Sequence, residues 1–181
     1  MSNASHVELL SRISLLHQNA FCQVWLFGEV FSVEYQLRLQ KTYFQFNNHS
    51  LLITVPQKPI KYQAILRSVL IQVARQYLTK RLLEIAGFCQ LTFNAVRIKE
   101  HRSKWGSCSS KKNINLNWRL ILLPKPVIDY VLVHELMHLH EMNHSTRFWA
   151  WVGQYLPDYQ SKEKNLREMA WTLHLYPNTR R

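Results

Sequence analysis

The residues with the clearest chemical potential are two histidines and a glutamate in the segment His134-Glu135-Leu136-Met137-His138. Side chains four residues apart lie on one face of a helix, so the imidazoles of His134 and His138 can bind one metal ion together. Glu135 lies about 100° further round the helix, where its carboxylate can reach a water on the metal rather than the metal itself. This spacing predicts a zinc hydrolase with two ligands and a general base.

A zinc site of this kind needs a third protein ligand, and His144 is the candidate, six residues after His138. Asn143 tolerates a left-handed backbone and can end the helix, which allows His144 to turn back toward the metal. Three imidazoles leave a fourth coordination position open for water, as in catalytic zinc sites. We therefore expect one Zn²⁺ ion per chain.

Two neighbouring residues have roles that the spacing leaves open. His140 lies about 200° from His138 round the helix, so we expect its ring to point away from the metal. Glu141 lies on the face of His134 and His138. Its carboxylate either orients one of their imidazoles or is a surface group of the last helical turn.

Peptide hydrolysis at such a site would use Glu135 twice. The carboxylate would take a proton from the attacking water and pass it to the leaving amine. Charge on the tetrahedral oxygen needs a further donor besides the metal. The sequence does not distinguish between the candidate donors, which are Tyr155, Tyr159, Arg147 and His140.

Upstream of the histidines, residues 102–109 form the polar segment Arg-Ser-Lys-Trp-Gly-Ser-Cys-Ser. Gly106 between Trp105 and a serine predicts a turn or bulge between two strands. Cys108 is a possible zinc ligand, but three histidines suffice, and we expect it to pack beside the site or line it. The following strand, residues 114–118, is expected to offer an exposed edge that holds a peptide by β-augmentation.

The elements that must position this site follow from hydrophobic periodicity. Period-two alternation within residues 24–56 indicates antiparallel strands and hairpins. Apolar residues recur at steps of three and four within residues 60–86, which indicates a long amphipathic helix that stops at Gly87. Further elements are expected as strands at 91–99 and 114–118, an apolar and therefore buried helix from Pro124 to about 141, and helices at about 145–155 and 160–173. This order is typical of an α+β fold.

We interpret the chain as a single domain, residues 1–181. Its parts are an N-terminal β-rich part (5–59), the long helix (60–88) and a metal-site core (91–174). Three widely spaced cysteines, Cys22, Cys89 and Cys108, indicate a reducing compartment rather than a disulfide framework. No apolar run approaches the roughly 18 residues of a membrane span, and no signal-peptide pattern is present. We expect a cytoplasmic protein without membrane contact, and the sequence leaves its oligomeric state open.

The chain is strongly basic. Lys and Arg number 23 against 11 Asp and Glu, which gives a formal net charge of +12. Such a surface attracts nucleic acid, nucleotides or acidic proteins, although a solvated basic face is an equally good interpretation. With 4 glycines and no glycine-rich stretch, the sequence excludes a phosphate loop and a dinucleotide fingerprint.

Several motifs in order resemble the YgjP-like metallopeptidases, which are similar to the SprT and WLM zincin groups. The motifs are Arg102-x-x-Trp105-Gly106-Ser107-Cys108-Ser109, Ile114-x-Leu116-Asn117-Trp118-Arg119-Leu120, Tyr130-Val131-x-x-His134-Glu135-Leu136-x-His138-Leu139, Asn143-His144-Ser145-x-x-Phe148-Trp149 and Pro157-Asp158-Tyr159. The resemblance is dense over about 95–172 and looser before it. It implies a zincin-like fold with a small mixed sheet packed on the buried site helix. It also implies zinc bound by His134, His138 and His144, and Glu135 as the catalytic acid/base.

Three functions compete. The first is a zinc-dependent peptidase acting on a peptide or protein substrate, with Arg102, Trp105, Tyr155 and Tyr159 as candidate substrate-binding residues. The second is a metal-dependent nucleotide pyrophosphatase or phosphohydrolase, whose phosphates would be held by the basic stretch before the site helix. The third is a nucleic-acid-associated protein that uses the basic surface.

Overall fold

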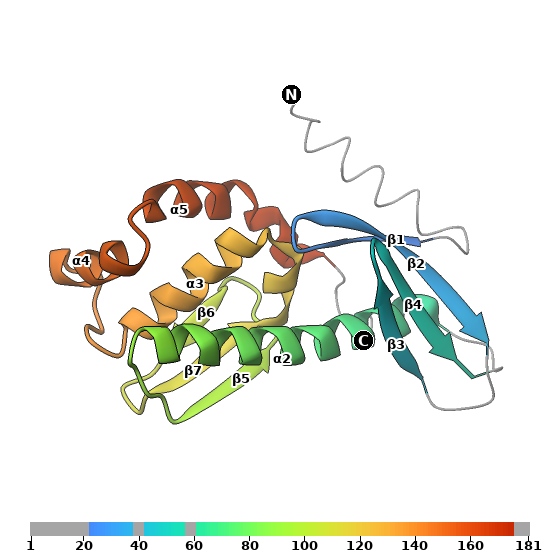
Figure 1. Cartoon of the computed structure of the whole chain (residues 1–181), viewed down its shortest axis with the longest axis horizontal. Helices are drawn as coiled ribbons and strands as arrows, with labels where there is room; N and C mark the ends of the chain where they lie inside the picture. Colours follow the sequence, from blue (N-terminus) through green and yellow to red (C-terminus); the bar gives the residue numbers. More distant parts are fainter. Residues whose placement is uncertain (1–21, 38–41, 57–60, 176–181) are drawn as a thin grey trace. The chain divides into compact units, whose positions relative to one another are not determined.

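The computed structural model describes residues 22–37, 42–56 and 61–175 (Figure 1). The chain divides into two compact units, Met1–Tyr62 and Gln63–Arg181. Each unit contains one small sheet, and nearly all of the described helical residues belong to the second unit, which confirms the α+β class. The single-domain assignment stays a prediction. Residues 5–21, 38–41 and 57–59 of the predicted N-terminal part lie outside the described residues.

The first unit is a four-stranded sheet in the order β1-β2-β4-β3. Its strands are β1 (Cys22–Leu26), β2 (Glu29–Leu37), β3 (Tyr43–Asn47) and β4 (Ser50–Val55). Phe27 and Gly28 join β1 to β2 and both have positive φ, at 55° and 84°. Positive φ at both central residues is the geometry of the tight hairpin turn whose twist matches that of the strands.

The prediction of antiparallel strands holds for two of the three pairings and is wrong for the third. β1 with β2 and β3 with β4 are antiparallel, whereas β2 and β4 run parallel. The chain leaves β2, forms the edge strand β3 and returns through a hairpin at Asn48 to insert β4 beside β2. Alternation in a sequence reports which side chains share a face, not the direction of the neighbouring strand.

The long helix is α2 (Tyr62–Phe88), and its apolar side chains at steps of three and four are buried. The helix ends at Phe88, one residue past the predicted stop at Gly87, and the left-handed residue after it is Gln90, with φ 55°. The Leu91 amide donates to the Ala86 carbonyl at 2.9 Å, and the Gln90 amide to the Gly87 carbonyl at 3.1 Å. These two bonds form a Schellman cap, which usually has glycine where this chain has glutamine.

The second sheet has the order β5-β7-β6. It consists of β5 (Ala95–Lys99), β6 (Gly106–Cys108) and β7 (Asn113–Asn117). β5 is parallel to β7 and β6 is antiparallel to it. Two predictions are corrected here. The segment around Gly106 is a short strand rather than a turn, and the strand at 114–118 is central, so its edges are already paired.

After β7 come the 3-10 helix η1 (Trp118–Leu122), α3 (Lys125–Met137), α4 (Thr146–Tyr155), α5 (Tyr159–Glu168) and the 3-10 helix η2 (Ala170–His174). α3 contacts β6, and α4 and α5 both contact α3 (Figure 1). Nine side chains of α3 are buried, which confirms the prediction of a helix that is apolar nearly all round. None of the helices in the described ranges is long and apolar enough to cross a membrane.

Candidate metal centre

The site begins where α3 ends. The helix was expected to run to about 141, but it ends at Met137, and His138 caps it. The Leu139 amide donates to the Leu136 carbonyl at 2.9 Å and the His140 amide to the Met137 carbonyl at 3.0 Å. These three-residue bonds tighten the last turn. The chain therefore leaves the helix early enough for residues 141–145 to fold back over it.

This reversal brings the three predicted ligands together. The candidate ligand atoms of His134, His138 and His144 all lie within 4.8 Å of one another. Nε2 of His144 is 3.0 Å from Nε2 of His134. His138 is buried, His134 is half-buried and His144 is exposed, so solvent reaches the cluster from the His144 side.

The second ring nitrogen of His138 is held by the backbone. Its Nδ1 lies 3.1 Å from the carbonyl oxygen of Glu141, which can only accept a hydrogen bond. The proton of a neutral His138 ring is therefore on Nδ1, and the lone pair of Nε2 is free for a metal. Glu141 thus orients an imidazole, as one of its two candidate roles proposed, but through its main chain rather than its carboxylate.

An aromatic ring supports all three imidazoles. The Phe148 side chain is fully buried, and its centroid lies 4.9, 4.6 and 4.8 Å from those of His134, His138 and His144. Ser145 begins α4 by accepting a hydrogen bond from the Phe148 amide at 3.3 Å. The same cap therefore fixes His144, just before it, and the Phe148 ring, one turn after it.

Burial and mutual proximity keep the buried imidazoles neutral. Burial, together with His138 and His144, lowers the pKa of His134 to about 3. Burial also lowers the pKa of His138, with His144 adding to the effect. Neutral rings are the form that binds a cation, so these two rings are prepared for one at neutral pH.

Glu135 lies beside the triad under β6. The side chain is buried, and Oε2 has no hydrogen-bond partner among the described residues. A Cβ at Gly106 would lie 2.5 Å from Oε1 of Glu135 and 2.7 Å from its Cγ and Cδ. Only glycine therefore fits against this carboxylate. Burial raises the pKa of Glu135 to about 8, and Lys104 opposes the shift.

Cys108, at the end of β6, is outside the ligand cluster of the described residues. Burial and the nearby Glu135 raise the pKa of its thiol to about 11, so the sulfur is protonated at neutral pH. A protonated thiol is a poor metal ligand. These properties fit a residue that packs beside the site.

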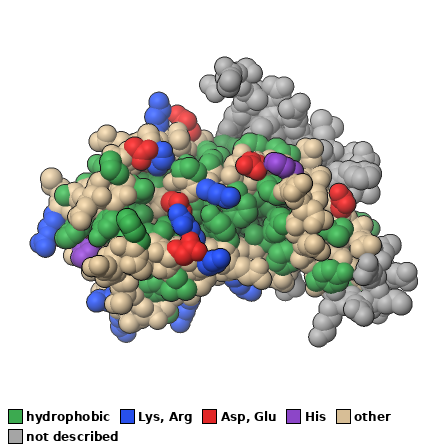
Figure 2. All heavy atoms as spheres, in the orientation of Figure 1, with side chains coloured by type: hydrophobic (Ala, Val, Ile, Leu, Met, Phe, Trp, Pro, Cys, Tyr) green, Lys and Arg blue, Asp and Glu red, His purple; other side chains and the backbone are tan. Residues whose placement is uncertain are grey.

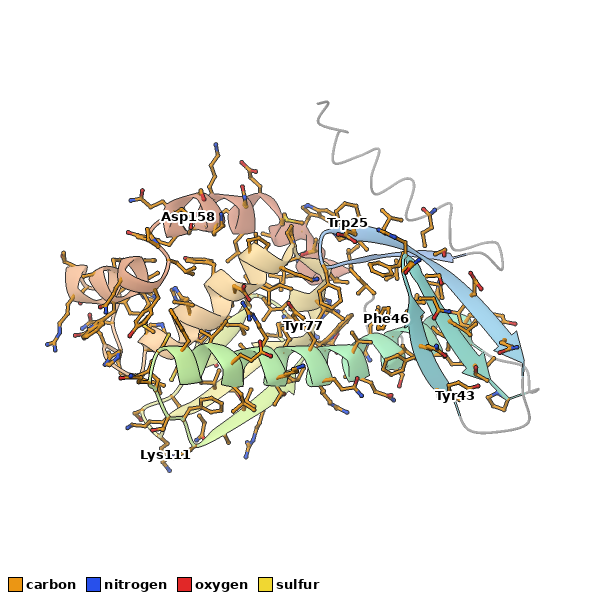
Figure 3. The ribbon with its side chains drawn as sticks, in the orientation of Figure 1. Trp25, Tyr43, Phe46, Tyr77, Lys111 and Asp158 are labelled. Atoms are coloured by element: carbon orange, nitrogen blue, oxygen red, sulfur yellow. The ribbon has the colours of Figure 1, made fainter. Side chains whose placement is uncertain are left out.

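The predicted donors and substrate-binding residues lie in different places, and Tyr159 is linked to the triad through Trp149, whose centroid lies 5.9 Å from that of His134 and 5.8 Å from that of His144. Tyr159, which follows Asp158 at the start of α5 (Figure 3), stacks on Trp149 with centroids 5.2 Å apart. The Tyr155 hydroxyl donates to the Cys89 carbonyl at 3.5 Å, at the end of α2. His140 points away from the triad, as expected, and stacks on Trp151 at 4.3 Å.

The remaining candidates are not brought to the triad by any contact of the described residues. Arg102 and Arg147 are exposed. Trp105 is half-buried, and its carbonyl accepts a hydrogen bond from the Asn117 amide at 2.8 Å. The substrate-binding roles of Arg102, Trp105, Tyr155 and Tyr159 stay predictions.

Four residues that serve the site were given no role from the sequence. They are Gly106, Asn117, Phe148 and Trp149. Phe148 is close to His144 in the sequence, but His144 precedes α4, so helical spacing does not relate the two side chains. The closeness of Gly106 to Glu135 had no local signal, since 29 residues separate them.

Two solved structures and one protein family are similar to this chain. This chain is similar to the metallopeptidase zymogen abylysin of Pyrococcus abyssi at 21 % identity and a TM-score of 0.45, covering 51 % of this chain and 94 % of that one. It is similar to the zymogen jannalysin of Methanocaldococcus jannaschii at 23 % identity and a TM-score of 0.44, covering 51 % and 93 %. No curated protein matches the sequence. The model of the YgjP-like metallopeptidase domain matches residues 16–169, and the chain therefore belongs to the YgjP-like metallopeptidase family.

Proposed function

We propose that the protein is a zinc-dependent peptidase in which His134, His138 and His144 hold one Zn²⁺ ion and Glu135 is the general base and acid. The observation that carries this proposal is the convergence of three imidazoles next to a buried carboxylate. Three histidines are a ligand set of catalytic zinc sites, which keep a fourth position open. Family membership supports the peptidase reaction.

The donor atoms fit a divalent cation. Nε2 of His138 carries a lone pair, because Nδ1 is bonded to the Glu141 carbonyl. Nε2 of His134 and Nε2 of His144 face each other at 3.0 Å, close to the spacing of two ligands on one zinc ion, since each Zn–N bond is about 2.0–2.1 Å long. The unpartnered Oε2 of Glu135 also suits the site, because an attacking water would satisfy it.

Zn²⁺ in such a ligand set supplies Lewis-acid activation of water and of a carbonyl group. The chain supplies the rest. Glu135 accepts the proton of the attacking water on a carboxylate oxygen and delivers it to the leaving amine. Burial raises the pKa of Glu135 in the metal-free chain, and this direction suits a carboxylate that must both accept and release a proton. Gly106 and β6 hold the carboxylate in place, and Phe148 excludes water behind the rings.

The test combines metal content with hydrolysis. Protein purified without chelator should contain one zinc per chain, and His138→Ala should lose it. The zinc-loaded protein should cleave members of a broad panel of unfolded proteins and peptides. Glu135→Gln should keep the zinc and lose the cleavage, because its amide cannot accept the proton. Identical behaviour of the wild-type protein and Glu135→Gln would refute the proposed role.

The phosphohydrolase hypothesis is settled by the same preparations. Nucleoside triphosphates replace the peptides, and release of phosphate or pyrophosphate is measured. Release that disappears in Glu135→Gln would favour that hypothesis over peptide hydrolysis. Release at background level would exclude the phosphohydrolase hypothesis.

A further inference from the structure

The loop that joins β5 to β6 is fixed beside Glu135 by one buried side chain. Asn117 is fully buried, and its Nδ2 donates to the carbonyls of His101 and Lys104, both at 2.9 Å. Its main-chain amide donates to the Trp105 carbonyl at 2.8 Å. The loop backbone therefore holds one conformation, and it leads directly to Gly106, which contacts Glu135.

This loop belongs to a segment with an excess of positive charge. Between residues 91 and 118 the cations are Arg97, Lys99, Arg102, Lys104, Lys111 and Lys112, and the single acid is Glu100. Glu100 is already shared between Arg67 and Arg119. The six cations are exposed and form none of the ion pairs found among the described residues. On the face shown in Figure 2, Lys and Arg side chains lie along the margin where Figure 1 places this sheet.

Lys104 is the cation of this group nearest to the chemistry. It lies two residues before Gly106, which is packed against the carboxylate of Glu135, and its charge opposes the rise in the pKa of that carboxylate. Lys111 is at the opposite end of the sheet, in the turn between β6 and β7 (Figure 3). The five residues of β7 separate the two ends by roughly 15 Å.

We propose that Lys104 is a specificity-determining residue that binds a carboxylate of the substrate close to the scissile bond, so that the enzyme prefers peptides that place a carboxylate there. This inference rests on the proposed peptidase function. An ammonium group binds anions as a point charge, and the anions that a peptide carries are carboxylates. Because Asn117 fixes the loop of Lys104 and that loop leads to Gly106 against Glu135, a carboxylate bound by Lys104 lies close to the reacting peptide. A nucleic acid lying along the strip would instead engage Lys104 and Lys111 alike.

Binding is measured on the zinc-loaded full chain carrying Glu135→Gln, so that peptides are not consumed. Three peptides with the same uncharged fluorescent label are compared by anisotropy at low salt. The first has internal Asp residues and an amidated C-terminus. The second has Asn in their place and a free C-terminal carboxylate. The third has Asn and an amidated C-terminus, and therefore no carboxylate.

We expect one or both carboxylate peptides to bind about two- to five-fold tighter than the neutral peptide, the range of a single exposed ion pair. Lys104→Gln should remove this preference, and Lys104→Glu should reverse it toward a peptide with Lys in place of Asp. Lys111→Gln, the matched control, should keep it. Which of the two carboxylate peptides gains affinity identifies the group that is recognised.

Equal binding of the three peptides, no binding of any, or a preference that survives Lys104→Gln would overturn the inference. An equal loss in Lys111→Gln would overturn it too, since that result describes general attraction to a basic surface. Hydrolysis of the same peptides by the zinc-loaded wild-type protein is the separate test of the peptidase proposal. Cleavage without preference refutes the Lys104 site alone, and a Lys104-dependent preference without cleavage refutes the peptidase alone.

Discussion

The contact between Gly106 and Glu135 gives the most specific prediction for catalysis. In Gly106→Ala, the new methyl group would lie 2.5 Å from Oε1 of Glu135, whereas ordinary contacts of this kind begin at 3.4 Å. The carboxylate must therefore move by about 1 Å, and a misplacement of that size costs about 100-fold in rate. This loss corresponds to about 2.7 kcal/mol of activation free energy. The three atoms nearest to the new methyl group all belong to Glu135, so we expect zinc binding to persist.

The assay is peptide hydrolysis by zinc-loaded protein, with kcat and KM separated and zinc content measured on the same samples. We expect kcat to fall about 100-fold while the zinc content stays at one per chain. Gly87→Ala is the matched control, because a Cβ there meets nothing within 4 Å and alanine favours the helix. In the double variant Gly106→Ala, Glu135→Gln, we expect kcat to be no lower than in Glu135→Gln alone, because both substitutions act through the same carboxylate. Wild-type kcat in Gly106→Ala with full zinc would refute the reasoning.

Three further predictions concern stability and metal binding. In the metal-free protein, Glu135 keeps its proton to about pH 8 when folded but releases it near its ordinary value of 4.5 when unfolded. Its contribution to stability therefore falls as pH rises through that window, by at most about 1.4 kcal/mol per pH unit. In urea titrations, the unfolding free energy of Glu135→Gln should rise relative to that of the wild-type protein from pH 5 to 7.5. Parallel pH profiles of the two proteins would contradict this. Phe148→Ala should cost about 3–5 kcal/mol of unfolding free energy and weaken zinc binding, because it removes a fully buried ring that packs against the three imidazoles. Unchanged zinc affinity in a competition titration would exclude this supporting role. Gln90→Gly should stabilise the protein by about 0.5–1 kcal/mol in urea unfolding, because glycine adopts φ 55° without strain. A loss of stability would mean that the Gln90 side chain contributes more to stability than the strain costs.

Several features of the site were already determined by the sequence, because they depend on local geometry. The four-residue step from His134 to His138 fixes both rings on one side of α3, whatever surrounds the helix. The apolar run before these two histidines predicted the burial of α3. A short polar turn was enough to bring His144 back to them. The same local rules placed His140 away from the triad, where it stacks on Trp151.

The tertiary structure decided what lies against these residues. Periodicity within a strand says nothing about its neighbours, so the parallel pairing of β2 with β4 and the central position of β7 were not predictable. The contact of Gly106 with Glu135, and the bonds from Asn117 to the loop of Lys104, join residues distant in the sequence. Such contacts depend on how strands and helices pack in three dimensions, and no short-range pattern encodes them. The sequence therefore identified the groups that could react, and the fold decided which backbone and which charges surround them.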